Sequence, residues 1–88
     1  MTDICTKEVF SVRLKQALKE KGISQGELQR RLDTTSKVVW SWTAGRWLPD
    51  LYSFSNICRV TGINPMYLMY GVGSVSLPES NELHEITL

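Results

Sequence analysis

S-Q-G-E-L-Q-R-R-L-D-T-T-S-K-V-V-W-S-W-T-A-G, residues 24–45, is the stretch that decides the fold of this 88-residue chain. It predicts two short helices joined by a tight turn at Asp33-Thr34. The first helix begins with the pattern S-x-x-E, in which Ser24 is the N-cap and Glu27 completes a capping box. The spacing of the apolar residues then gives each helix one face that can be buried.

The second of these helices combines an apolar face with a polar one. Its N-cap is Thr35 or Ser36, and its apolar face joins Val38 or Val39 to Trp42. Short polar or basic side chains occupy the opposite face: Thr35, Ser36, Lys37 and Ser41. A helix that is buried on one side and carries hydrogen-bonding groups on the other is suited to contact the edges of DNA bases.

This stretch resembles the helix-turn-helix of the phage repressor and Cro family, also called XRE-like. Nine residues fall in register with the family pattern: Ser24, Gln25, Leu28, Leu32, Thr35, Val39, Trp42, Gly45 and Pro49. Downstream, T-G-I-N-P-M-Y-L-M-Y-G-V-G resembles the family's closing segment, and the match extends from Phe10 to Gly73. The resemblance implies an all-α, five-helix bundle of the phage-repressor DNA-binding type, in which the second and third helices form the helix-turn-helix.

Apolar spacing predicts the other three helices at Glu8–Lys21, Leu51–Thr61 and Met66–Tyr70. The last of them follows Asn64-Pro65, a cap and first-turn proline. The expected buried face of the second comprises Leu51, Phe54, Ile57 and Cys58. These elements divide the chain into a flexible N-terminal arm (1–7), a helix-turn-helix DNA-binding domain (8–73) and an acidic tail or linker (74–88).

The charges are unevenly distributed although the net charge is only +1. Residues 10–47 hold eight basic side chains against three acidic ones, whereas residues 74–88 hold three acidic side chains and neither Lys nor Arg. A basic half with an acidic end favours a polyanionic partner, although an ordinary solvated surface has the same composition. The acidic end fits either a complete Cro-like protein or a linker to the missing part of a longer repressor.

Several classes of protein are disfavoured by the sequence. No apolar run approaches the roughly 20 residues of a membrane-spanning helix, and no signal peptide is recognisable. Cys5 and Cys58 form neither a disulfide framework nor a zinc motif, and we expect Cys58 to be a core thiol. The lone His84 has no catalytic spacing to another residue, and Gly71-Val72-Gly73 is no dinucleotide motif. We therefore expect no enzyme, cofactor or metal, and a cytoplasmic location.

Candidate base contacts follow from the position of each residue in the matched motif. They are Ser36, Lys37 and Ser41, together with Thr35, which could contact a base or a phosphate. Lys37 can donate to the O6 and N7 acceptors of guanine, or it only neutralises phosphate. The candidate phosphate contacts are Gln25, Ser24, Arg46 and Arg13. The resemblance implies that Gln25 also braces the recognition helix, whereas the arginines have the alternative of ordinary solvated side chains.

Four further positions carry expectations of their own. Asp33 stands where the family usually has glycine and must adopt left-handed backbone geometry. Thr43 replaces a common acidic residue, so the family's buried ion pair should give way to an apolar contact. Trp40 and Trp47 could cover the core edge, join a dimer interface or stack on the DNA backbone, and we favour partial burial or an interface.

The sequence thus predicts a sequence-specific double-stranded DNA-binding transcription regulator, a phage or prophage repressor that binds an inverted-repeat operator as a homodimer. Candidate dimer contacts lie in the last helix: Met66, Tyr67, Met69 and Tyr70. No membrane or small-molecule partner is evident. The alternative is an antitoxin-like protein-interaction module with secondary DNA binding.

Overall fold

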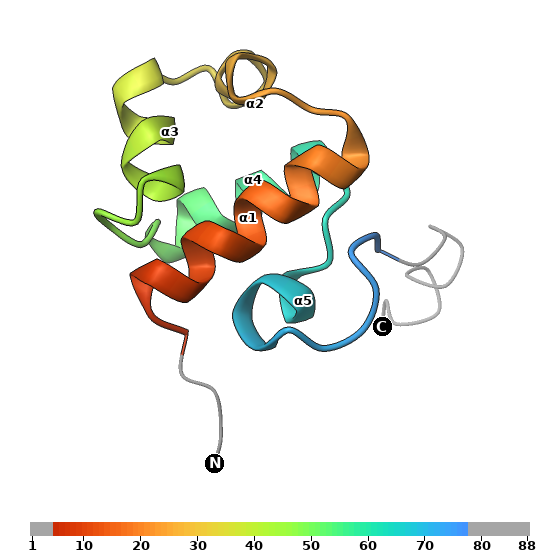
Figure 1. The fold of residues 1–88 in the computed structure, drawn as a ribbon. Helices are drawn as coiled ribbons and strands as arrows, with labels where there is room; N and C mark the ends of the chain where they lie inside the picture. Colours follow the sequence, from red (N-terminus) through yellow and green to blue (C-terminus); the bar gives the residue numbers. More distant parts are fainter. Residues whose placement is uncertain (1–4, 78–88) are drawn as a thin grey trace.

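The structure, a computed structural model, describes residues 5–77 and contains five α-helices and no β-strand within that range (Figure 1). The helices are α1 (Lys7–Lys21), α2 (Gln25–Leu32), α3 (Ser36–Thr43), α4 (Leu51–Thr61) and α5 (Pro65–Tyr70). In Figure 1, α1 crosses the front of α4, α2 and α3 lie above it, and α5 lies below it. The all-α fold class is confirmed, and the helix limits predicted from spacing hold to within one residue. Within the described range, no helix has both the length and the apolar character needed to cross a bilayer.

Side-chain caps begin the helices where the sequence indicates. Ser24 Oγ accepts the amide of Glu27 at 3.0 Å. Thr35, rather than Ser36, caps α3 by accepting the Val38 amide at 3.3 Å. The second half of the predicted capping box is wrong, because the Glu27 carboxylate is engaged by the guanidinium groups of Arg30 and Arg31. A charged guanidinium is a stronger donor than a neutral backbone amide, so α2 gains two ion pairs on its surface.

Left-handed residues end α2 and α3 as the sequence predicts. Asp33 has φ 55° and ψ 49°, and the Thr34 amide behind it donates to the carbonyl of Gln29 at 3.2 Å. Gly45 has φ 75°, and the next amide, that of Arg46, donates to the Ser41 carbonyl at 2.9 Å. Such bonds satisfy carbonyl groups that the last turn of a helix leaves open.

The hydrophobic core lies between α1 and the other helices. Its members are Phe10, Leu14, Ala17, Leu18, Ile23, Leu28, Val39, Trp42, Ile57, Cys58, Ile63 and Leu68. Of the face predicted for α4, Ile57 and Cys58 are buried, and Phe54 is half-buried with its ring centroid 6.1 Å from that of Phe10. The prediction is wrong for Leu51, which is 82% exposed. Leu51 has the right helical phase, but it is the first residue of α4 and extends past the end of the core.

At both ends of the described range, residues that the sequence assigned to the tail or to the arm make contacts with the domain. Residues 74–77 pair with residues 62–64: the Asn64 amide donates to the Val75 carbonyl at 2.7 Å, and the Leu77 amide donates to that of Gly62 at 2.9 Å. Val75, which the sequence assigned to the tail or linker, packs against the core. At the other end, Thr6 caps α1 within the segment predicted as an arm. Residues 1–4 and 78–88 lie outside the described residues, and with them the three acidic residues of the tail and His84.

Candidate functional site

The buried residues of α3 show which side of this helix faces outward. Val39, Trp42 and Thr43 are buried. Successive side chains of an α-helix are about 100° apart around its axis, so Lys37 and Ser41 project from the side opposite these buried residues. Lys37 is exposed and Ser41 is half-buried. The Ser41 hydroxyl donates to the Val38 carbonyl at 2.7 Å, so its lone pairs can accept but its proton is already used.

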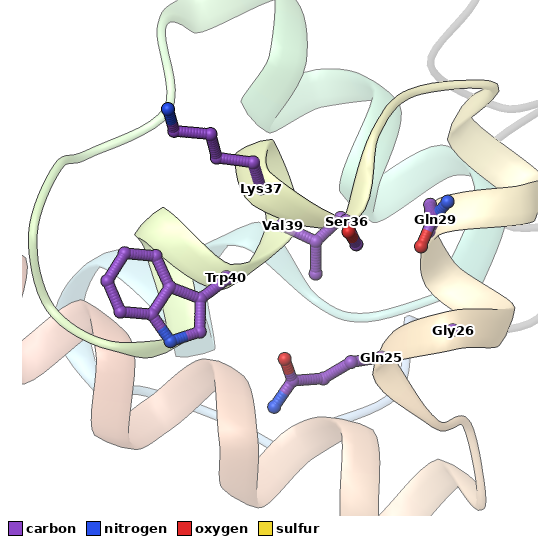
Figure 2. A pocket seen from close by; sticks show the side chains of 7 residues that line it. All are labelled: Gln25, Gly26, Gln29, Ser36, Lys37, Val39 and Trp40. Carbon is purple, nitrogen blue, oxygen red and sulfur yellow. The ribbon is translucent and has the colours of Figure 1, made fainter.

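A recess of about 490 Å³ lies between α2 and α3 (Figure 2). The residues that line it are Gln25, Gly26, Gln29, Ser36, Lys37, Val39 and Trp40. Trp40 and Gln25 flank its lower part in Figure 2, and Lys37 extends away from the α2 side chains. Two of the predicted base contacts, Ser36 and Lys37, and one predicted phosphate contact, Gln25, therefore meet at one site. Gln29 was missed, although it lies one helical turn after Gln25.

A chain of hydrogen bonds holds α1, α2 and α3 together beside this recess. The hydroxyl of Thr43, which is only 3% exposed, donates to Gln25 Oε1 at 3.0 Å. Ser11 Oγ in α1 donates to the Thr43 carbonyl at 2.9 Å. The expected apolar contact at Thr43 is therefore wrong, because a buried hydroxyl requires a partner and finds one in Gln25. Gln25 thus contacts α3 directly.

Arg46 contacts Trp40, one of the residues that line the recess. The guanidinium carbon of Arg46 lies 5.6 Å from the Trp40 ring centroid, within the range of a cation–π contact. Trp40 is 50% exposed and Arg46 is also exposed. The sequence left the role of Trp40 open, and the structure brings it to the candidate site. Of the two expectations for Trp47, partial burial is wrong, because it is 69% exposed and does not line the recess, and an interface stays a prediction.

Arg13, a predicted phosphate contact, lies elsewhere. Its Nη1 donates to the Met69 carbonyl at 2.9 Å and approaches that of Leu68 at 3.4 Å. These carbonyls belong to the last turn of α5, where a positive charge is favourable. Arg13 thus joins α1 to α5, and the structure does not bring it to the α2–α3 recess.

Two lysines that were not among the predicted contacts lie beside Ser24 and Gln25. A second recess, of about 310 Å³, is lined by Lys15, Leu18, Lys19, Ile23, Ser24 and Gln25. Lys15 and Lys19 are four residues apart in α1, a spacing that puts them on one face and that could have indicated them. The Ser24 hydroxyl is used as the cap of α2. Because Gln25 borders both recesses, a basic surface continues from α3 to α1.

The four predicted dimer contacts in α5 differ in how far they are exposed. Met66 and Tyr70 are exposed, whereas Tyr67 is half-buried against the core. Met69 lines an apolar groove of about 280 Å³. The other residues of this groove are Cys5, Phe10, Leu48, Pro49, Leu51 and Phe54. An apolar surface therefore exists near α5, but the four predicted residues do not form one exposed patch.

Within residues 5–77, no three His, Cys, Asp or Glu side chains gather in a way that could hold a metal ion. No protein-family model, curated protein or solved structure matches this chain. The geometry of the recess and of the surface around it is therefore the basis for a functional proposal.

Proposed function

We propose that this chain is a sequence-specific double-stranded DNA-binding transcription regulator of the phage repressor or Cro type, which acts in the cytoplasm on an inverted-repeat operator as a homodimer. In this proposal, α2 and α3 form a helix-turn-helix and α3 enters the major groove. The observation that carries it is the outward face of α3, where Ser36, Lys37 and Trp40 surround one recess with the glutamines of α2. With its side chains, an α-helix such as α3 is about 10–12 Å across, which matches the roughly 12 Å width of the major groove.

Each side chain at the surface has a chemical role in this proposal. Lys37 donates to the O6 and N7 acceptors of guanine, and the Ser36 hydroxyl hydrogen-bonds a neighbouring base edge. Ser41 acts as an acceptor because its proton is used within α3. Thr35 contacts a base or a phosphate with the part of its hydroxyl that the Val38 amide does not use.

Phosphate contacts surround these groups. Arg46 lies beside Trp40, which lines the recess, and Ser24 and Gln25 lie at the start of α2. Lys15 and Lys19 extend the same surface along α1. Such contacts supply affinity that does not depend on sequence and that falls as the salt concentration rises, because bound phosphates release their counterions.

Selection of bound duplexes from a random DNA pool, followed by titration of the selected duplex at several salt concentrations, tests the proposal. We expect an inverted repeat with half-site centres about 34 Å apart and a steep decline of affinity with salt. Absence of any enriched sequence, together with weak binding that all duplexes share, would contradict the proposal.

Dimer formation is a separate part of the proposal. The exposed Met66 and Tyr70 are suited to an interface, since Met and Tyr are enriched in such surfaces. Sedimentation with and without the selected duplex measures the state of the protein. Two copies on each inverted repeat are expected, and a single copy on a full-length site would contradict the homodimer.

A protein-interaction module, antitoxin-like in character, is the second candidate. The apolar groove beside Leu48 and Leu51 favours it, because large exposed apolar surfaces mark sites for partners. A module of this kind should lose its protein partner when Trp47 or Tyr70 is changed to Ala. It should also bind DNA with little sequence preference, which is the outcome that the duplex selection distinguishes.

A further inference from the structure

Trp40 presents a large apolar surface inside an otherwise polar site. Its side chain is half exposed, three residues after Lys37 on the outward part of α3, and it lines the recess with Gln25 and Ser36 (Figure 2). The core position of this helix is already filled by Trp42. Exposed indole surface is unfavourable in water, so Trp40 is suited to contact an apolar group of whatever enters the recess.

Arg46 fixes the position of this surface. Its guanidinium lies over the Trp40 ring, and its backbone amide is bonded to the Ser41 carbonyl at the end of α3. The left-handed Gly45 before it turns the chain back toward α3. The indole therefore has a cation beside it, and a guanidinium in a cation–π contact keeps N–H donors for a phosphate.

The cations near Trp40 favour a nucleic acid duplex as the partner, because Lys37 lines the same recess and the Arg46 guanidinium lies over the Trp40 ring. In the major groove the apolar group that the bases present is the C5-methyl of thymine. We propose that Trp40 is a specificity-determining residue that recognises a thymine methyl group, and that Arg46 is the positioning residue that orients its ring. This inference rests on the proposed function and adds to it the base atom that is contacted.

Replacement of single thymines by uracil tests the inference, since uracil keeps every hydrogen-bonding group and lacks only the methyl. The probe is the duplex obtained by selection, with one thymine changed at a time in each half-site. For the wild-type protein, we expect one position at which uracil weakens binding about three- to fivefold per half-site, the effect of losing one buried methyl group. The Trp40→Ala variant should bind thymine and uracil duplexes equally.

Matched variants separate this effect from general damage. Trp47→Ala removes another exposed tryptophan outside the recess and should keep the wild-type preference for thymine. Arg46→Lys keeps the charge but loses the planar guanidinium beside the Trp40 ring, so it should reduce the preference for thymine while leaving the salt dependence unchanged. Thermal unfolding of each variant checks that the fold is kept.

Two results would overturn the inference while leaving the proposed function intact: no position sensitive to uracil, or the same sensitivity in Trp40→Ala as in the wild type. Failure of the proposed function has a different signature. It is seen earlier, when the selection from the random pool yields no preferred duplex, and it removes the inference as well.

Discussion

The hydroxyl of Thr43 lies 3.0 Å from Oε1 of Gln25, and this hydrogen bond joins the two helices that border the recess. Through its carbonyl, which accepts from Ser11, Thr43 also contacts α1. A single buried threonine thus sets the relative position of three helices. The bond also occupies the oxygen of the Gln25 amide and leaves its nitrogen as the donor.

Removal of this bond should loosen the helix pair. Thr43→Val keeps the shape of the side chain but loses the donor, and we expect the free energy of unfolding to fall by about 1 kcal/mol. Urea denaturation measures the change. Gln25→Ala should cost less when it is combined with Thr43→Val than when it is made alone, because both changes remove the same bond. Gln16→Ala, at an exposed position of α1, is the control, and strictly additive effects of the pair would contradict the coupling.

Lys37→Ala should weaken binding to the selected duplex by about 1–3 kcal/mol and relax the base preference at one position. The fold should be unchanged, because Lys37 is exposed. Competition binding with duplexes changed at each base measures both effects. Arg59→Ala removes a basic residue from α4, outside the recess, and should leave the preference intact. An equal loss of affinity for every duplex after Lys37→Ala would reduce its role to phosphate contact.

Two apolar residues of α4 should lose very different amounts of folding stability on truncation. Ile57 is fully buried, and Ile57→Ala should cost about 2–5 kcal/mol of folding stability through the cavity that it leaves. The exposed Leu51 should cost less than about 0.5 kcal/mol when changed to Ala. Thermal or urea unfolding compares the two variants. A large loss for Leu51→Ala would mean that its side chain is covered in solution, for example by a partner copy.

The Cys58 thiol should make folding stability depend on alkaline pH. Burial raises the pKa of this thiol to about 11 from an ordinary value of 9.0. The unfolded chain therefore loses its proton first, so the contribution of Cys58 is fully present well below pH 9 and declines, by at most about 1.4 kcal/mol per unit, as the pH rises from 9 toward 11. Urea denaturation at several pH values should show a shallower decline for Cys58→Ala, and equal slopes would refute the assignment.

Local chemistry made much of this fold predictable from sequence. Side-chain caps act within three residues, so Ser24 and Thr35 indicated where α2 and α3 begin. Asp33 tolerates the left-handed region better than most residues, and it is the one non-glycine residue with positive φ within residues 5–77. The recess follows from these helix limits, because they decide which side chains of the two helices face each other.

Non-local contacts were the part that sequence reasoning did not find. Arg13 looked like a solvated cation, but its partners are carbonyl groups 55 and 56 residues away. The partners of Glu27 are different, because Arg30 and Arg31 are local and stand at spacings of three and four residues that the sequence could have indicated. The pairing of residues 74–77 uses backbone groups, which leave no mark in the side-chain pattern.

That pairing has a consequence for local opening of the protein. A helix of six residues such as α5 does not persist alone in water. It is held between two segments, 62–64 and 74–77, that bond to each other, and by Arg13 at its last turn. Residues 62–77 should therefore exchange their amide hydrogens for deuterium as one cooperative unit, faster than the buried turns of α1. If the amides of Asn64 and Leu77 exchanged at unrelated rates, the closing segment and α5 would be separate units.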